Sequence, residues 1–366
     1  MIRKLFMLAL CASFFSCAVS RKIHTEDVSL HFQDEYIIPP DLDFKGTRVG
    51  GLSGIDYADG EFYFVCDQSS NPRIYSGHIS TENQQIDSVY FDDLIQLQKE
   101  PFPNTVFDLE SVRKLTEPDA FLVTSEGYIE NGSDPGIYKV NTDGKITTEF
   151  KIPNYFTASG TQKPRNNGVF EGVCKSFDGK AYWVAMELPL EKDGAKPKIY
   201  PTHSHVRFTK YDAETGLPVR QFVYKLDGIA KLPINFFAVN GVTELLEYAP
   251  NRFLVLERAY SAGYGSNGNT VKIFEVDATE ATNTLEFQNL KKASYQKAHK
   301  SLIFNFKHIK DQLKSDIIDN IEGMCFGPEM NGKPSLLLVS DNNFNSFAEQ
   351  VSQILLFTVD FKNKEH

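Results

Sequence analysis

The sequence has 366 residues, of which 41% are hydrophobic and 23% charged, and its formal net charge is −10. This is the composition of a globular protein with enough length for a large core. Phosphate backbones must be neutralised by clustered Lys and Arg, and the acidic sequence has no such cluster, so we expect no nucleic acid partner.

The N-terminus carries an export signal. Two basic residues at positions 3 and 4 precede the apolar run 5–15, which is followed by Ser16 and Cys17. A basic start, a short apolar stretch and a small residue at the cut are typical of a signal peptide. The final Cys resembles that of a bacterial lipobox, although Phe14 and Phe15 replace the usual aliphatic and small residues. We therefore expect a signal peptide over 1–17, lipidation at Cys17 and a linker over 18–27.

These features predict secretion across the inner membrane and a lipid anchor in the bacterial cell envelope, either the periplasm or the outer membrane. The mature protein would then touch the membrane only through its anchor. No later apolar stretch approaches the length that a transmembrane helix needs.

One unit recurs five times along the rest of the chain, and such repetition indicates a repeat architecture. Its first half has a small or acidic residue, often followed by Gly, and then apolar residues. Its second half, after a turn, is an apolar strand that ends in Asp or Glu. Turn signals such as Asp59-Gly60 and Asn331-Gly332 indicate hairpins between the halves. The five copies begin at Gly51, Asp108, Phe170, Val242 and Ile321.

A more variable strand follows each copy, and often a fourth strand follows that one. Four antiparallel strands per repeated unit are typical of a propeller blade. We therefore predict an all-β fold, a single β-propeller domain over residues 28–362. It should have five blades, or six if the long insertions hold a degenerate one. The last copy has only three strands, so we expect the segment 28–38 to supply its fourth strand and close the ring, which hides the sheet edges.

Two regions depart from the strand pattern. Residues 308–319 have apolar side chains at helical spacing, which predicts a short helix. Residues 188–205 show no strand pattern, and we expect a loop over one face. Of the cysteines in the mature chain, Cys66, Cys174 and Cys325 lack metal-ligand spacing, so we expect buried, unpaired thiols.

The first strand of every propeller blade lines the central channel, so the repeat should gather carboxylates there. The first halves supply Glu110, Glu171, Glu244 and Glu322, with Ser53 in the fifth position. The second halves end in Asp67, Glu126, Glu187, Glu257 and Asp341. Two charges about 4 Å apart repel by roughly 4 kcal/mol at an effective dielectric of 20. A bound cation, Arg partners or raised pKa values must therefore compensate.

Oxygen ligands without nearby His or Cys favour Ca²⁺ or Mg²⁺. We predict a Ca²⁺ site with ligands drawn from Glu110, Glu171, Glu244, Glu322, Asp67 and Asp341. Three arginines near the acidic motifs, Arg73, Arg165 and Arg258, are predicted to act with Glu171 in catalysis, because Arg binds anions bidentately. Three amides, Asn167, Asn342 and Asn343, are predicted to bind a small anionic substrate. The same Glu and Arg residues would also suit salt-bridged rings that pin the blades together, and this alternative stays open.

Five motifs resemble the phytase-like family, also described as "esterase-like activity of phytase". They span residues 50–54, 165–172, 253–258, 319–323 and 338–344. The resemblance covers roughly residues 45–360, with one departure at Val169, a small insertion in the usual Gly-Phe-Glu-Gly run. It implies a propeller that hydrolyses phosphate esters. Other propeller phytases use Ca²⁺ in an acidic channel, but their motifs do not occur here, so their mechanism is an analogy.

The residues and the resemblance together predict a metal-dependent phosphoesterase of the cell envelope that acts on a phosphorylated small molecule. Glu171 would be the general base. Two alternatives come from the same features. One is a non-catalytic propeller that binds a ligand or a partner, and the other is a calcium-dependent lactonase or carboxylesterase.

Overall fold

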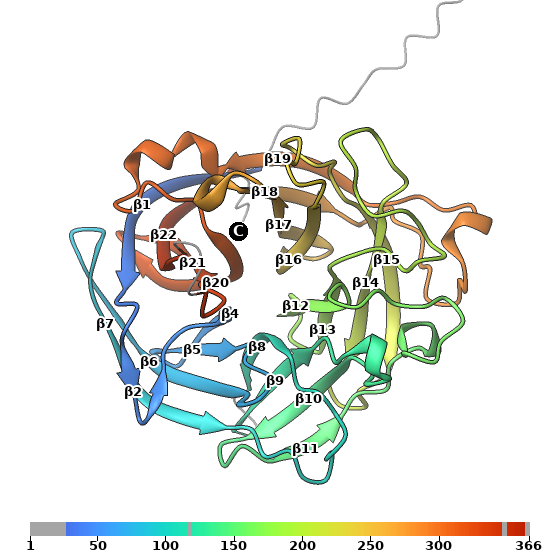
Figure 1. The fold of residues 1–366 in the computed structure, drawn as a ribbon, viewed down its shortest axis with the longest axis horizontal. Coiled ribbons are helices and arrows are strands. Elements are labelled where there is room, and N and C mark those ends of the chain that lie inside the picture. The colour runs from blue at the N-terminus through green and yellow to red at the C-terminus, as the bar shows by residue number, and fades with distance from the viewer. Residues whose placement is uncertain (1–26, 116–118, 346–349, 363–366) are drawn as a thin grey trace, which may run out of the picture.

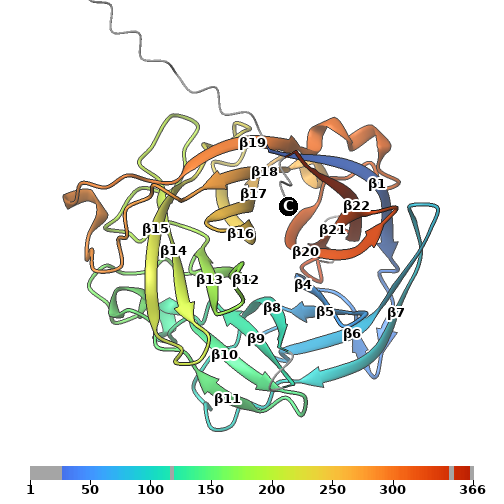
Figure 2. The same cartoon turned by 180° about the vertical axis from the view of Figure 1, so that it is seen from behind.

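The computed structural model describes residues 27–115, 119–345 and 350–362. The predicted signal peptide, Cys17 and nearly all of the linker lie outside this part of the chain. Five four-stranded antiparallel sheets are arranged around a common centre, as Figure 1 shows from one face and Figure 2 from the other. The five-bladed propeller predicted from the repeat is therefore confirmed.

Blades 1 to 4 each run from an inner to an outer strand in chain order. Blade 1 holds β4 (Leu52–Ala58), β5 (Glu61–Cys66), β6 (Arg73–Glu82) and β7 (Gln85–Gln96), and blade 2 holds β8 (Leu109–Leu115), β9 (Ala120–Ser125), β10 (Gly136–Asn141) and β11 (Ile146–Glu149). Blade 3 holds β12 (Phe170–Lys175), β13 (Ala181–Met186), β14 (His205–Asp212) and β15 (Pro218–Lys225), and blade 4 holds β16 (Ala238–Ala249), β17 (Arg252–Ser261), β18 (Asn269–Asp277) and β19 (His299–Asn305).

Blade 5 contains both ends of the described chain. Its strands are β20 (Asn320–Met330), β21 (Lys333–Asp341), β22 (Ser352–Phe361) and, outermost, β1 (Val28–Ile38). β1 pairs antiparallel with β22 from Val28 opposite Phe361 to Ile38 opposite Ser352. The N-terminal strand therefore closes the ring, as predicted. A small hairpin of β2 (Asp43–Phe44) and β3 (Thr47–Arg48) follows it.

Sequence patterns explain the hairpins and the core. Between β4 and β5, Asp59 and Gly60 both have positive φ (54° and 91°), as a type I′ turn requires. The core lies between neighbouring blades and is built from their alternating apolar residues. Trp183 of blade 3, for example, packs its ring against Phe253 of blade 4 with centroids 5.4 Å apart. The three remaining cysteines are buried free thiols, as expected.

The two irregular regions had different outcomes. Residues 188–205 form a loop that ends where β14 begins, as predicted. The helix predicted over 308–319 is wrong, because only the short 3-10 turns η5 (Phe306–His308) and η6 (Lys310–Gln312) form there. Ser315 instead binds the Glu35 carboxylate of β1 through its N–H and hydroxyl, and Asp316 has a positive φ of 55°, which ends any helical path. Among the described residues, no helix has the length and apolar character that a membrane span requires.

Candidate functional site

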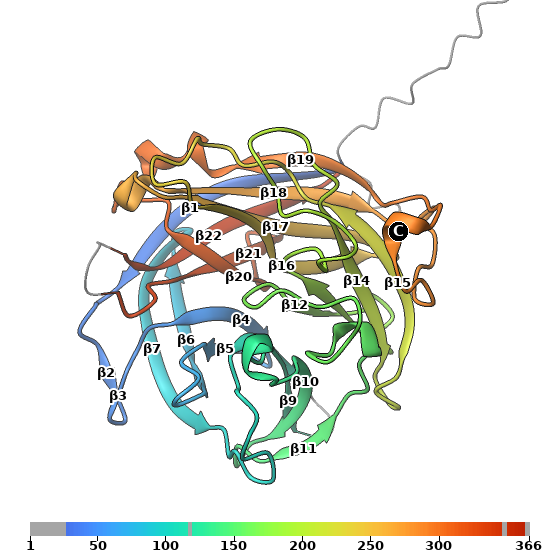
Figure 3. The ribbon, with the colours of Figure 1, turned by 45° about the vertical axis from the view of Figure 1, so that its right-hand side comes forward.

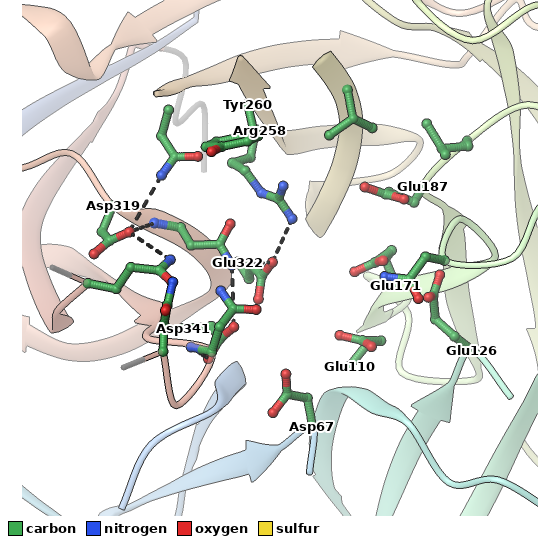
Figure 4. A pocket seen from close by; sticks show the side chains of 18 of the residues that line it. Asp67, Glu110, Glu126, Glu171, Glu187, Arg258, Tyr260, Asp319, Glu322 and Asp341 are labelled. Carbon is green, nitrogen blue, oxygen red and sulfur yellow. Dashed lines mark hydrogen bonds and ion pairs between the residues drawn. The ribbon is translucent and has the colours of Figure 1, made fainter. Parts of the chain in front are cut away.

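The inner strands surround a cavity of about 850 Å³ at the centre of the ring. Figure 3 shows the inner strands β4, β12, β16 and β20 gathered around that centre. Nine carboxylate side chains and two basic ones are among the residues that line it. The acids are Asp67, Asp108, Glu110, Glu126, Glu171, Glu187, Asp319, Glu322 and Asp341, and the basic residues are Lys196 and Arg258. Figure 4 shows many of them converging on one space.

A β-bulge near the start of each inner strand sets the direction of these side chains. In every blade the pairing register between the first and second strands shifts at the repeat position. Such bulges commonly re-aim a side chain next to a functional site. The residues skipped at the shifts include Glu110, Glu171 and Glu322, which point into the cavity. Ser53 and Thr243 occupy this position in blades 1 and 4, and their hydroxyls donate to backbone carbonyls of neighbouring blades.

Blade 4 differs from the sequence alignment of the repeats by one residue. Thr243 is the bulged residue, and Glu244 lies opposite Leu256, just as Gly323 of blade 5 lies opposite Val339. A one-residue slip moves a side chain to a different environment. Glu244 and Glu257 therefore do not line the central cavity, and Arg258 takes the position that Asp341 holds in blade 5.

Glu244 instead belongs to a buried ion pair away from the cavity lining. Its carboxylate lies 2.8 Å from the Arg113 guanidinium and accepts a hydrogen bond from Ser111 at 2.8 Å. Arg113 also donates to the carbonyls of Ile55 and Met324. This pair thus links inner strands of blades 1, 2, 4 and 5. The predicted role of Glu244 as a metal ligand is not supported by this position, and the salt-bridged alternative describes it better.

Two groups of three carboxylates could each hold a cation. One is Asp108, Glu110 and Glu126, and the other is Glu126, Glu171 and Glu187. Within each group, one oxygen from each side chain lies within 4.8 Å of the others. We call them the first and second triads. Ca²⁺ takes six to eight oxygen ligands, so each triad would leave positions for water or a substrate.

Glu126 is common to both triads and is held in place by the backbone. Its Oε1 accepts a hydrogen bond from the Val169 N–H at 2.6 Å. Val169 is the residue inserted in the family-like motif, so this departure supplies the donor that fixes the shared carboxylate.

Burial and mutual repulsion raise the pKa of the cavity acids. Burial is the larger cause, and neighbouring carboxylates add to it, raising the pKa of Asp67 to about 7, of Asp108 to about 6 and of Glu126 to about 8. The pKa values of Glu110 and Glu171 are raised well above the usual range for the same two reasons. Ionising all of these groups together would therefore require a nearby cation.

Arg258 is a basic side chain of the cavity lining that is ion-paired with one of the acids. Its Nη2 donates to Glu322 Oε1 at 2.6 Å, and the charges of Glu187 and Glu171 also act on it. Figure 4 shows Arg258 with the second triad on one side of its guanidinium and Glu322 on the other. Arg258 is therefore the predicted Arg residue that the structure places where an anionic ligand could reach it.

The other predicted residues divide between the cavity and its surroundings. Glu110, Glu171, Glu322, Asp67, Asp341, Asn167 and Asn343 all line the cavity. Arg73 does not line it: it is buried, and it donates to the Tyr75 hydroxyl at 2.6 Å and to the Arg48 carbonyl at 3.0 Å. Arg165 donates to the carbonyls of Pro189 and Gly194, which holds the 188–205 loop.

Asn342 also lies outside the cavity lining. Its side-chain oxygen accepts hydrogen bonds from the N–H groups of Gly51 and Phe344, both at 3.1 Å. It therefore orders the loop after β21 rather than facing a ligand.

Several lining residues were not assigned to the site from the sequence. Asp108 and Asp319 precede the repeat glutamates by two and three positions, so their sequence signal was available. Glu126 and Glu187 were recognised as acids at strand ends but were not assigned to a metal. Lys196, on the 188–205 loop, had no signal, because a loop's path over the cavity does not follow from its sequence.

A comparison with known proteins adds a family and several structures of similar shape. A family model described as "Phytase-like: Esterase-like activity of phytase" matches residues 47–344. No curated protein matches the sequence. Similar solved structures include a member of the duf4221 family from Bacteroides vulgatus, with 12% identity, a TM-score of 0.41 and coverage of 91% of this chain and 98% of the other.

A luciferin-regenerating enzyme has 10% identity, a TM-score of 0.40 and coverage of 85% of this chain and 92% of its own. A glycosyl hydrolase from Bacteroides ovatus has 10% identity, a TM-score of 0.42 and coverage of 84% and 83%. At these values the likenesses carry no argument about chemistry.

Proposed function

The chain belongs to the phytase-like family, and from this premise we propose that its central cavity binds divalent cations, Ca²⁺ first among them, and hydrolyses a phosphate ester of a small molecule. The observation that carries this proposal is the pair of carboxylate triads sharing Glu126 on the wall of an open cavity. Oxygen-only ligands suit a hard cation.

The triads fit such a cation on charge as well as on ligand type. The raised pKa values of the cavity acids show how costly their ionisation is without a positive partner. When bound, a divalent cation would polarise the phosphate and lower the pKa of a bound water.

The chain's own residues would then bind and orient the substrate. Arg258, fixed by Glu322, would receive phosphate oxygens, and Asn167 and Asn343 would donate to the substrate from the cavity wall. The second triad uses one oxygen of Glu171, which leaves the other to accept the proton of the attacking water.

The test is hydrolysis of p-nitrophenyl phosphate and phytate by protein stripped with EDTA and then supplied with Ca²⁺ or Mg²⁺. We expect phosphate release that depends on the added metal and that falls at least 100-fold in Glu171→Gln. Absence of phosphate release at every Ca²⁺ concentration and pH would overturn the proposal. Release of p-nitrophenol only from the acetate ester, or of hydroxy acid from a lactone, would replace it with the carboxylesterase alternative.

Ca²⁺ binding without turnover of any ester would favour a ligand-binding propeller. Direct metal analysis of the purified protein separates that case from an absent metal site. We also propose, from the N-terminal sequence signal, that the protein acts in the cell envelope. Release of a Cys17→Ala variant from the membrane fraction, with the wild type retained there, tests the anchor.

A further inference from the structure

An exposed apolar surface borders the cavity on the side of blade 4. Two segments form it, the approach to β16 and the loop after β17. We call its members the apolar rim: Leu232, Ile234, Phe236, Phe237 and Tyr264. Phe236 is 98% exposed and Phe237 is 59% exposed. Soluble proteins seldom expose clustered large apolar side chains without a use for them.

The apolar rim is continuous with the cavity. Phe237 and Tyr260 both line the cavity, and their ring centroids lie 6.2 Å apart. Ala238 and Val239 extend this apolar wall inward. A ligand that reaches Arg258, two residues from Tyr260 on β17, would therefore meet apolar surface on its way out.

Hydrogen bonds hold the two segments together, so the apolar rim is preorganised before a ligand binds. The Ile234 N–H donates to the Ala262 carbonyl, and the Ala262 N–H donates to the Phe237 carbonyl, both at 2.9 Å. The Tyr264 hydroxyl donates to the Leu232 carbonyl at 2.8 Å. Binding to such a surface loses little conformational entropy.

Phe236 has a backbone conformation that bulky residues rarely adopt. Its φ is +58°, in the left-handed region that costs an aromatic residue free energy. Strained backbone of this kind clusters at ligand-binding sites, where it presents a side chain. Here it presents a fully exposed ring beside the cavity.

The charge of the cavity limits what kind of anion can bind. Nine carboxylates and two basic side chains line it, so even two bound divalent cations would leave an excess of potential negative charge. A polyphosphate would meet that excess on several sides. A ligand with a single phosphate could place it between the cations and Arg258 and leave the rest of its surface uncharged.

We infer that the physiological ligand carries one phosphate group joined to an apolar alkyl or aryl group, and that this apolar group packs on the rim. The inference deepens the proposed function and rests on its assignment of phosphate binding to the cavity. It sets the ligand apart from a polyol polyphosphate such as phytate. The rim could instead contact a membrane. Phe237, however, belongs to the rim and also lines the cavity, which favours a ligand that extends from the cavity onto the rim.

The test compares methylphosphonate with hexylphosphonate, which share a head group and have a C–P bond that ester hydrolysis does not cleave. Calorimetric titration of the Ca²⁺-loaded protein gives both affinities. Each fully buried methylene raises affinity about fourfold. For five methylenes on a partly open surface we expect hexylphosphonate to bind at least tenfold more tightly. Phytate should compete no better than methylphosphonate.

The variants Leu232→Ser and Phe236→Asn remove apolar surface at two rim residues that do not line the cavity, and Asn tolerates a positive φ. Each should reduce the hexyl-to-methyl ratio to less than threefold while methylphosphonate affinity stays within threefold of the wild type. Phe177→Ser is the matched control, because Phe177 is another large exposed apolar residue (59%, against 66% for Leu232) but lies on the β12–β13 turn, where its N–H donates to Glu247 near the far end of β16 from the rim. It should keep the wild-type ratio, and all three should unfold at the wild-type temperature within a few degrees.

Equal binding of the two phosphonates by the wild type would overturn the inference while leaving the proposed function in place. Failure of both to bind in Ca²⁺ would overturn both. A third arm uses phosphatidylcholine vesicles. If the wild type sediments with them, Phe236→Asn does not, and the phosphonates bind equally, the rim is a membrane contact and the inference is wrong.

Discussion

Glu126 is the side chain whose replacement best tests the proposed cation sites, because both triads share it. We predict that Glu126→Gln stabilises the metal-free protein and removes most of the stabilisation that Ca²⁺ provides. The glutamine side chain keeps an oxygen that can accept the Val169 N–H, so the change removes charge with little change in shape.

The size of the metal-free effect follows from the pKa of Glu126. Burial and the neighbouring Glu187 raise this pKa from 4.5 to about 8. The native state therefore keeps a proton that the unfolded state loses above pH 4.5, so the free energy of unfolding falls as the pH rises toward 8. At pH 7 this loss is on the order of 3 kcal/mol. Gln does not titrate and should recover much of it.

In the presence of Ca²⁺ we expect Glu126→Gln to lower the free energy of unfolding instead of raising it, because the ionised carboxylate would then be a metal ligand. Changing a residue that only orients a ligand costs up to about 100-fold in metal affinity, so loss of a shared ligand should cost at least that. A 100-fold loss removes about 2.7 kcal/mol of ligand-induced stabilisation. Urea unfolding at pH 7 measures the free energy of unfolding of each variant, first in EDTA and then in Ca²⁺, and the difference between the two is the stabilisation by the metal.

Glu322→Gln is the matched control, because Glu322 lines the same cavity but belongs to neither triad. Its Ca²⁺ affinity should stay within tenfold of the wild type. Full Ca²⁺ stabilisation in Glu126→Gln would refute the shared-ligand reasoning. A metal-free wild type whose stability rises between pH 5 and pH 8 would refute the pH dependence derived from the raised pKa of Glu126.

Three further predictions concern other parts of the molecule. Glu244→Gln should lower the free energy of unfolding, measured in urea, by about 3–5 kcal/mol, because it leaves the buried Arg113 charge without its partner. The double variant Glu244→Leu/Arg113→Met should recover most of this loss, and an unchanged stability of Glu244→Gln would show that the ion pair is not needed. Arg258→Met should raise KM for p-nitrophenyl phosphate at least tenfold while calorimetric Ca²⁺ affinity does not fall, and an unchanged KM would remove Arg258 from the substrate site. Deletion of residues 1–38 removes β1, so size-exclusion chromatography should show larger species than the intact protein gives, and an unchanged assembly size would contradict the closure argument.

The repeat made most of the fold predictable, because each blade repeats the same pattern of apolar strands and turns. Even the closing strand followed from a simple count, as the last copy lacked one strand and residues 28–38 were left over. The predicted helix over 308–319 failed although Ile309, Leu313 and Ile318 do pack into the core, because Glu35 holds Ser315 and Asp316 adopts a positive φ.

The site was less predictable, because a β-bulge shifts register without a distinctive residue. The sequence alignment placed Glu244 beside Glu171, but the bulge in blade 4 falls at Thr243 and moves Glu244 away from the cavity. Arg73 shows a second limit. It lies near Asp67 in sequence, yet its strand directs it toward Tyr75 and the Arg48 carbonyl. A position close to a motif in the sequence therefore predicts the blade in which a residue lies, but not the direction in which its side chain points.

Ring closure has a consequence for the order in which the molecule can be completed. β1 is made first and β22 last, yet they pair, and the Lys362 N–H donates to the Asp27 carbonyl at 2.8 Å. Blades 1 to 4 can assemble as they are synthesised, while blade 5 cannot be completed until β22 has been made. Because the two ends meet there, a short linker between them, with new ends opened between β7 and β8, would give a circular permutant whose blades are each continuous in sequence.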